Sequence, residues 1–247
     1  MRKIIKLVLA GLLSVSTIAV AAESSPEALR IGYQKGSIGM VLAKSHQLLE
    51  KRYPQTKISW VEFPAGPQML EALNVGSIDL GSTGDIPPIF AQAADARAAF
   101  QQGNVDAWAI WDPYYSAALL QGGVRVLKDG TDLNQTGSFY LAARPYAEKN
   151  GAFIQGVLTT FSEADALTRS QREQSIALLA KTMGLPAPVI ASYLDHRPPT
   201  TIKPLSAEVA ALQQQTADLF YENRLVPKKV DIRQRIWQPT QLEGKQL

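Results

Sequence analysis

The chain has 247 residues, of which 46% are hydrophobic and 19% charged, a composition typical of a globular protein with one or two domains. It has no cysteine, which excludes disulfides, thiolate catalysis and cysteine-ligated metal sites. Its 25 basic and 22 acidic residues give a net charge of +3. The two histidines, His46 and His196, lie too far apart for metal-ligand spacing, so we expect no metal site.

Residues 1–22 are predicted to be a secretory signal peptide. Arg2, Lys3 and Lys6 precede an uncharged apolar stretch over 7–20, and small residues at its end form a cleavage pattern. The stretch is shorter than the about 20 apolar residues that a membrane-spanning helix needs. Removing the three basic residues of this segment leaves 22 basic and 22 acidic residues. That balance does not favour nucleic-acid binding.

The part of the chain that follows the signal predicts alternating strands and helices. The predicted strands are 29–33, 58–63 and 78–80, and the predicted helices are 37–52, 67–75 and one that Pro87 and Pro88 open. This alternation predicts an α/β fold with a parallel sheet.

The remaining elements are mainly helical. We predict strands at 105–111, 124–127 and 138–143 and a helix that begins at Asp112–Pro113. Four further helices are predicted over 145–161, 163–183, 188–194 and 206–223. The tail from Leu225 is predicted to be irregular. A basic cluster near it is interpreted as a solvated face: Arg224, Lys228, Lys229, Arg233 and Arg235.

A weak internal repeat relates residues 73–79 to residues 100–106. In each copy a glycine, Gly76 or Gly103, ends a helix, and an apolar residue and an aspartate follow. Two copies suggest two similar lobes. Any helix–glycine–strand unit has this pattern too, so both interpretations stay open.

Polar residues follow three of the predicted strands, at 36–37, 82–85 and 111–114. In open α/β sheets, ligands bind at the carboxyl ends of strands, and helix N-termini there offer N–H groups to anions. Ser82, Thr83 and Asp85 are also the residue types that cap helices. Trp111 is either a stacking surface for an apolar ligand tail or part of the core. The pattern favours a site for a small, permanently charged anion.

No catalytic motif is present. The sequence contains no Walker loop, no dinucleotide fingerprint, no Gly-x-Ser-x-Gly elbow and no His-Glu-x-x-His. Two histidines leave few candidates for a general base. We therefore expect a binding protein that uses no cofactor, and an enzyme on the same fold is a less favoured alternative.

Four segments together resemble the aliphatic sulfonate-binding proteins of bacterial ABC importers: IGYQKGS (31–37), FPAGPQ (63–68), GSTGDIPP (81–88) and AIWDPY (109–114). The resemblance extends over nearly the whole chain. It implies an α/β fold of the periplasmic-binding-protein type II, with two lobes and a hinge. It also implies a monomeric periplasmic receptor that delivers its ligand to a membrane permease and an ATPase.

The resemblance places eight residues at the ligand cleft: Gly36, Ser37, Ser82, Thr83, Gly84, Asp85, Trp111 and Asp112. It implies that they hold the sulfonate anion at helix N-termini between the lobes.

One departure from the family is large, because an internal segment is missing between Ala94 and Asp95. We predict one fused helix over 88–102, since alanine-rich sequence without a turn residue joins its two sides. The resulting domains are residues 23–93 plus 137–247 as lobe 1, and residues 94–136 as a remnant of lobe 2. A remnant of this size is at the limit for a core of its own. The alternative function is therefore a truncated receptor that no longer binds.

Overall fold

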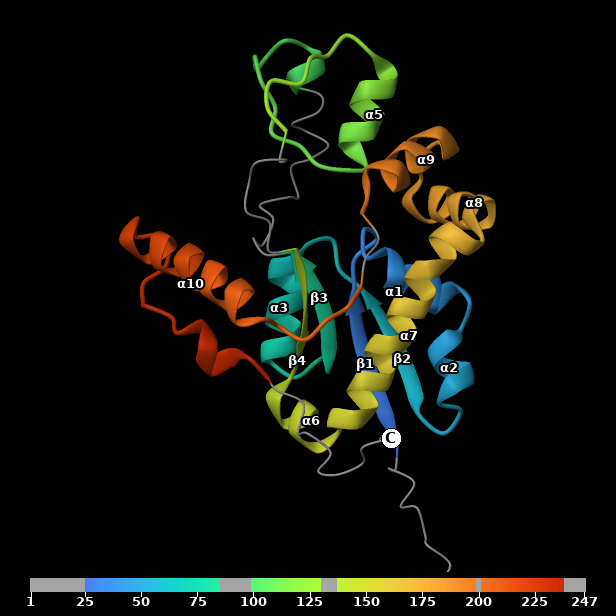
Figure 1. Ribbon diagram of the computed structural model, residues 1–247, viewed down its shortest axis with the longest axis vertical. Coiled ribbons are helices and arrows are strands. Elements are labelled where there is room, and N and C mark those ends of the chain that lie inside the picture. Colours follow the sequence, from blue (N-terminus) through green and yellow to red (C-terminus); the bar gives the residue numbers. More distant parts are fainter. Residues whose placement is uncertain (1–24, 85–98, 130–136, 199–200, 238–247) are drawn as a thin grey trace, which may run out of the picture.

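The computed structural model describes residues 25–84, 99–129, 137–198 and 201–237 (Figure 1). The predicted signal peptide, the helix start at Pro87 and Pro88, and the junction of Ala94 with Asp95 lie outside these ranges. Of the predicted fused helix, only its end is described, and residues 99–101 are helical.

A four-stranded mixed sheet forms the centre of the described structure, in the order β2-β1-β3-β4. Its strands are β1 (Ala28–Tyr33), β2 (Lys57–Glu62), β3 (Leu80–Gly84) and β4 (Ser138–Ala142). β1 pairs in parallel with β2 and β3, and β4 runs antiparallel to β3. The α/β class is confirmed. The prediction of a parallel sheet is wrong at one edge, because the strand order does not follow from local patterns.

Helices α1 (Ile38–Ser45), α2 (Leu48–Arg52) and α3 (Gly66–Asn74) connect the parallel strands. The single helix predicted over 37–52 is interrupted at Gln47, which has a left-handed φ of 53°. A residue other than glycine rarely adopts that conformation. The apolar spacing is helical on both sides of Gln47, so the sequence pattern does not reveal the break.

The C-terminal half supplies α6 (Arg144–Lys149), α7 (Gly151–Ser170), α8 (Arg172–Met183), α9 (Ala187–His196), α10 (Ala207–Glu222) and the 3-10 helix η1 (Ile232–Arg235). The breaks lie at Asn150 and Gln171 rather than at 162, where helical residues continue without interruption. Within the described ranges no single helix is long and apolar enough to cross a membrane, although α8 and α9, bent by 113°, pass that test as a pair.

The main core lies on the sheet face that α1 and α7 cover (Figure 1). Leu29 and Ile31 of β1 and Phe161 of α7 are fully buried there. On the opposite face, α3 approaches β1 and β3 closely at two glycines. A Cβ atom at Gly32 would lie 2.5 Å from the Ile78 side chain, and one at Gly81 would lie 2.8 Å from the sulfur of Met69.

Residues 99–129 contain the helical turn at 99–101 and α5 (Tyr114–Gln121) but no strand. The strands predicted at 105–111 and 124–127 are therefore wrong. A strand must pair its backbone N–H and C=O groups with a neighbouring strand, and among the described residues neither segment lies in a sheet. Their side chains Val105, Val126 and Leu127 are exposed as a result.

The two copies of the internal repeat share the conformation of their glycine turns but not the element that follows. Gly76 and Gly103 have nearly the same left-handed φ, 73° and 72°. Only Gly76 leads into a strand, β3, so the repeat does not produce two similar sheets among the described residues.

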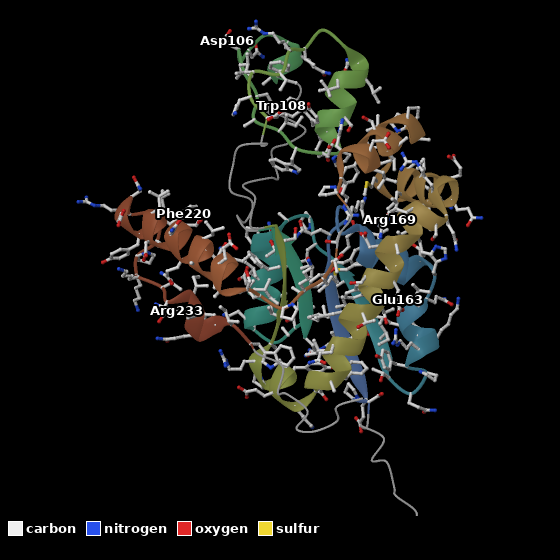
Figure 2. The ribbon with its side chains drawn as sticks, viewed as in Figure 1. Asp106, Trp108, Glu163, Arg169, Phe220 and Arg233 are labelled. Atoms are coloured by element: carbon white, nitrogen blue, oxygen red, sulfur yellow. The ribbon has the colours of Figure 1, made fainter. Side chains whose placement is uncertain are left out.

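α10 and η1 form an arm beside the sheet (Figures 1 and 2). Ser206 caps α10 by accepting a hydrogen bond from the Val209 amide at 3.2 Å, close to the predicted start. The five basic residues near the C-terminal end are all exposed, which confirms that they form a solvated face.

Candidate anion-binding site

The turn between β1 and α1 presents helix amides at the carboxyl end of the sheet. The Ser37 amide donates to the carbonyl of Gln34 at 2.9 Å, and the Ile38 amide donates to that of Gly36 at 3.0 Å. The next two amides, of Gly39 and Met40, have no acceptor within the helix. The Ser37 side chain makes no capping hydrogen bond. This end of α1 therefore offers N–H groups and a hydroxyl to an anion.

Residues 82–84 of the predicted loop at 82–85 form the end of a strand instead. Ser82, Thr83 and Gly84 belong to β3 and pair with Tyr140, Phe139 and Ser138. The interpretation of Ser82 and Thr83 as helix caps is therefore wrong. Their partner strand lies more than fifty residues later in the chain, so no local pattern reveals it. Asp85 lies outside the described residues.

Thr83 carries a buried hydroxyl without a partner. The Ser82 and Thr83 residues are 6% and 7% exposed, and Thr83 Oγ1 has no hydrogen bond within the part of the chain that the structure describes. Leaving such a group unpaired costs about 1–3 kcal/mol, and buried polar groups in native proteins are nearly always paired. A ligand that reaches this end of β3 would supply the missing partner.

Gln34 joins the two halves of the candidate site. Its side-chain amide donates to the Ser82 carbonyl at 3.3 Å, so the turn that contains Gly36 and Ser37 lies beside the end of β3. Gln34 is not among the site residues predicted from the sequence. A polar residue at the first position after a buried strand is the signal that identifies it.

Tyr140 adds a neutral donor on the face that Ser82 shares. The two residues are directly paired across β3 and β4, and the Tyr140 ring stacks on Phe161 of α7. Burial, and secondarily the charge of Asp165, raises the pKa of the Tyr140 phenol well above its usual value, although Arg197 opposes the shift. The phenol therefore stays protonated and able to donate at neutral pH.

The structure places Trp111 and Asp112 apart from this turn, on the segment that leads into α5 (Figure 1). Asp112 Oδ1 accepts hydrogen bonds from the Ser116 amide at 3.0 Å and from its hydroxyl at 2.5 Å. Its Oδ2 lies 3.3 Å from Nδ1 of His196 in α9. Asp112 thus caps α5 and links it to α9, and Trp111 is 44% exposed.

No group of three or more histidine, aspartate or glutamate side chains in the described ranges could hold a metal ion. Ser116, His196 and Asp112 meet, but the same ring nitrogen, Nδ1, faces both partners. A nucleophilic triad instead needs opposite ring nitrogens for the serine and the carboxylate. The three side chains therefore do not form such a triad.

Comparison with known proteins finds no matching family model. A curated relative from Escherichia coli (strain K12), an aliphatic sulfonates-binding protein by name, is 75% identical over 319 aligned positions, which cover 100% of both chains. The crystal structure of the periplasmic aliphatic sulphonate binding protein SsuA from Escherichia coli matches with a TM-score of 0.84. It is 74% identical, and the match covers 90% of this chain and 96% of that one. The alkanesulfonate-binding protein SsuA from Xanthomonas axonopodis pv. citri, bound to MOPS, matches with a TM-score of 0.79 at 43% identity, over 87% and 99% of the two chains.

The mixed sheet, its helical layers and these structural matches define the periplasmic-binding-protein fold. The chain belongs to the family of aliphatic sulfonate-binding proteins. The alignment of 319 positions exceeds the 247 residues of this chain, so the relative from Escherichia coli contains positions that have no counterpart here. The matched relatives are binding proteins by name, which agrees with the absence of a catalytic motif.

Proposed function

We propose that the chain is the periplasmic receptor of an ABC importer, which binds an aliphatic sulfonate and presents it as a monomer to a membrane permease and an ATPase. Family membership supports this proposal. The relative from Xanthomonas was crystallised with MOPS, a buffer molecule whose propanesulfonate arm is itself an aliphatic sulfonate. The proposed role is binding and delivery, not catalysis.

The observation that carries the proposal is the buried, unpartnered hydroxyl of Thr83 at the end of β3, next to Ser82, whose carbonyl accepts a hydrogen bond from Gln34. A sulfonate has three oxygens and stays ionised at any accessible pH. Neutral donors at a helix N-terminus suit such an anion, because hydrogen bonds to a charged acceptor are about twice as strong as neutral ones. The helix dipole adds about 0.3–1 kcal/mol.

We assign the anion contacts in lobe 1 to Gly36, Ser37, Ser82 and Thr83, with Gly84 and Asp85 at the rim. Trp111 and Asp112 belong to the facing lobe, where Trp111 offers a surface to the alkyl chain and Asp112 fixes α5. We place lobe 1 at residues 23–93 plus 137–247 and lobe 2 at residues 94–136. Because lobe 2 has no strands within its described residues, we expect the cleft to close less completely than in longer relatives.

The alternative is a truncated receptor that folds without binding. The exposed apolar side chains Val105, Val126 and Leu127 favour it, since they lack the neighbours that a complete lobe would supply.

Isothermal titration calorimetry of the purified protein with ethanesulfonate decides between these two functions. The receptor predicts saturable binding, displacement by MOPS and a melting temperature that rises with ligand concentration. A chain that melts cooperatively but shows neither heat nor a melting shift is the truncated receptor.

A further inference from the structure

The junction of α7, α8 and α9 contains a hollow, and half of its lining residues are arginines. Figure 2 shows Arg169 at the end of α7 that adjoins α8. Six residues line the hollow: Thr168, Arg169, Arg172, Leu194, Arg197 and Pro198. Its three arginines come from the last turn of α7, the first residue of α8 and the residue after α9.

A buried carboxylate holds two of these arginines in place. The Asp165 side chain is 4% exposed, and its Oδ1 lies 2.6 Å from Nη2 of Arg197. Its other oxygen, Oδ2, lies 3.6 Å from Nη1 of Arg169. The Arg197 side chain is 20% exposed and that of Arg169 is 50% exposed, so the ion pair with the buried Asp165 restrains Arg197 more than Arg169.

The third arginine is held from the opposite side. Arg172 Nη2 lies 2.6 Å from Asp195 Oδ1 and 3.3 Å from the Ala191 carbonyl oxygen. Among the described residues, three guanidinium groups therefore share two carboxylates, which leaves one positive charge in excess at the hollow. α8 begins at Arg172, so the positive end of its dipole adds to that charge.

The arginines keep donors for a ligand. Their contacts within the described ranges use Nη1 of Arg169 and Nη2 of Arg172 and Arg197, whereas a guanidinium has five N–H groups. Its planar fork matches two oxygens of one anion. The hollow has no aromatic lining residue and only two apolar ones, Leu194 and Pro198, so it suits a compact anion and not a ring or an alkyl chain.

We propose that this hollow is a second anion site, for a tetrahedral inorganic oxyanion of the sulfate or phosphate class, bound by Arg169, Arg172 and Arg197. Asp165 is the positioning residue of this site. None of the residues that line the hollow belongs to the turn that contains Ser37, so the oxyanion and an aliphatic sulfonate occupy different positions.

The test is a calorimetric titration of the purified protein with sodium sulfate, repeated with sodium phosphate, at an ionic strength held constant with sodium chloride. We expect saturable binding of at least one anion by the unaltered protein. The double variant Arg169→Gln/Arg172→Gln should bind that anion at least tenfold more weakly. Arg233→Gln, which removes one exposed charge from η1, is the matched control and should bind normally.

Two further measurements keep the result interpretable. If the double variant does not melt cooperatively, Arg172→Gln alone replaces it, because the Asp195 partner is 66% exposed and tolerates the loss. Ethanesulfonate is then added to the sulfate complex, and the sulfate Kd should not change. Absence of saturable binding, equal affinity in the arginine variants, or displacement by ethanesulfonate would each overturn the second site. None of these outcomes depends on whether ethanesulfonate binds at the first site.

Discussion

Nδ1 of His196 lies 3.3 Å from Oδ2 of Asp112, and this contact joins the segment that carries α5 to helix α9. Ser116, which is fully buried, bonds to the other oxygen of the same carboxylate. The Tyr115 and His196 rings also approach each other, with 5.5 Å between their centroids. The Asp112 carboxylate thus caps the first turn of α5 and also connects α5 to α9.

Asp112→Asn should detach α5 in part. The amide keeps the size of the side chain but loses the charge that strengthens its hydrogen bonds, so we expect the free energy of unfolding to fall by about 1–2 kcal/mol. Urea denaturation measures this change, and hydrogen exchange should speed up across α5. Asp106→Asn alters an exposed carboxylate of the same segment (Figure 2) and should have no effect. Equal stability of both variants would remove the attaching role from Asp112.

Asp79 ties the start of β3 to β1. It is 5% exposed and accepts hydrogen bonds from the amide, Nε and Nη2 of Arg30 at 2.8, 3.0 and 2.6 Å. The hydrogen bond to Asp79 raises the pKa of Arg30. Asp79→Ala leaves these donors unpaired, and because Arg30 is partly exposed we expect a loss of about 1–3 kcal/mol by urea denaturation. Asp106→Ala, which removes an exposed carboxylate, is the control, and a loss no larger than in that control would contradict the prediction.

Gly32 and Gly36 predict opposite consequences of the same substitution. Gly32→Ala brings a Cβ within 2.5 Å of Ile78 Cδ1 and 3.0 Å of Met69 Cγ, and overpacking of this kind costs about 1–3 kcal/mol. A Cβ at Gly36 meets nothing within 4 Å. Gly36→Ala should therefore keep the melting temperature while Gly32→Ala lowers it by several degrees. Equal melting temperatures would show that α3 moves away from β1 freely.

Alkaline pH should destabilise the protein through three partly buried tyrosines. Burial raises the pKa values of Tyr140, Tyr146 and Tyr193 above the value of about 10 for an exposed phenol. The folded state therefore holds these protons more tightly than the unfolded state. Their stabilising effect is complete below pH 10, roughly the unfolded pKa, and is lost as the pH rises toward the folded values.

Tyr140→Phe removes one of these protons and should flatten the decline of the free energy of unfolding between about pH 10 and about pH 12. Urea denaturation at a series of pH values measures the slope. Tyr221→Phe, on exposed α10, should leave the slope unchanged. A slope for Tyr140→Phe that matches the unaltered protein would place the Tyr140 phenol in water.

The first part of the sheet and its helices were predictable from local pattern. β1 and β2 lie within one residue of the predicted ranges 29–33 and 58–63, and α10 begins just after the capping serine, Ser206. In these segments the apolar period and the cap chemistry agree with the tertiary structure. The break at Gln47 was not predictable, because it depends on how α1 and α2 pack and not on a helix-breaking residue.

Where the structure depends on distant partners, one strand was predicted as a loop and one irregular segment was predicted as a strand. Residues 82–84 have the small and polar composition of a loop, but pairing with β4 makes them a strand. Residues 105–111 have strand-like composition but pair with no strand among the described residues, so they stay irregular. The same reasoning applies to the site. Ser37 was predicted from the turn alone, whereas the contact of Gln34 with Ser82 and the neighbouring Tyr140 required the fold.

The measurement that bears most directly on the sulfonate site is a comparison of Thr83→Val with Thr159→Val, by melting and by titration with ethanesulfonate. Thr83→Val removes a buried, unpartnered hydroxyl, so without ligand we expect a stabilisation of about 1 kcal/mol and a higher melting temperature. The same variant should bind ethanesulfonate about tenfold more weakly. Thr159, an exposed residue of α7 whose hydroxyl bonds to the Gln155 carbonyl, should change neither property. A Thr83→Val variant that binds ethanesulfonate as tightly as the unaltered protein would contradict the placement of the anion at the end of β3.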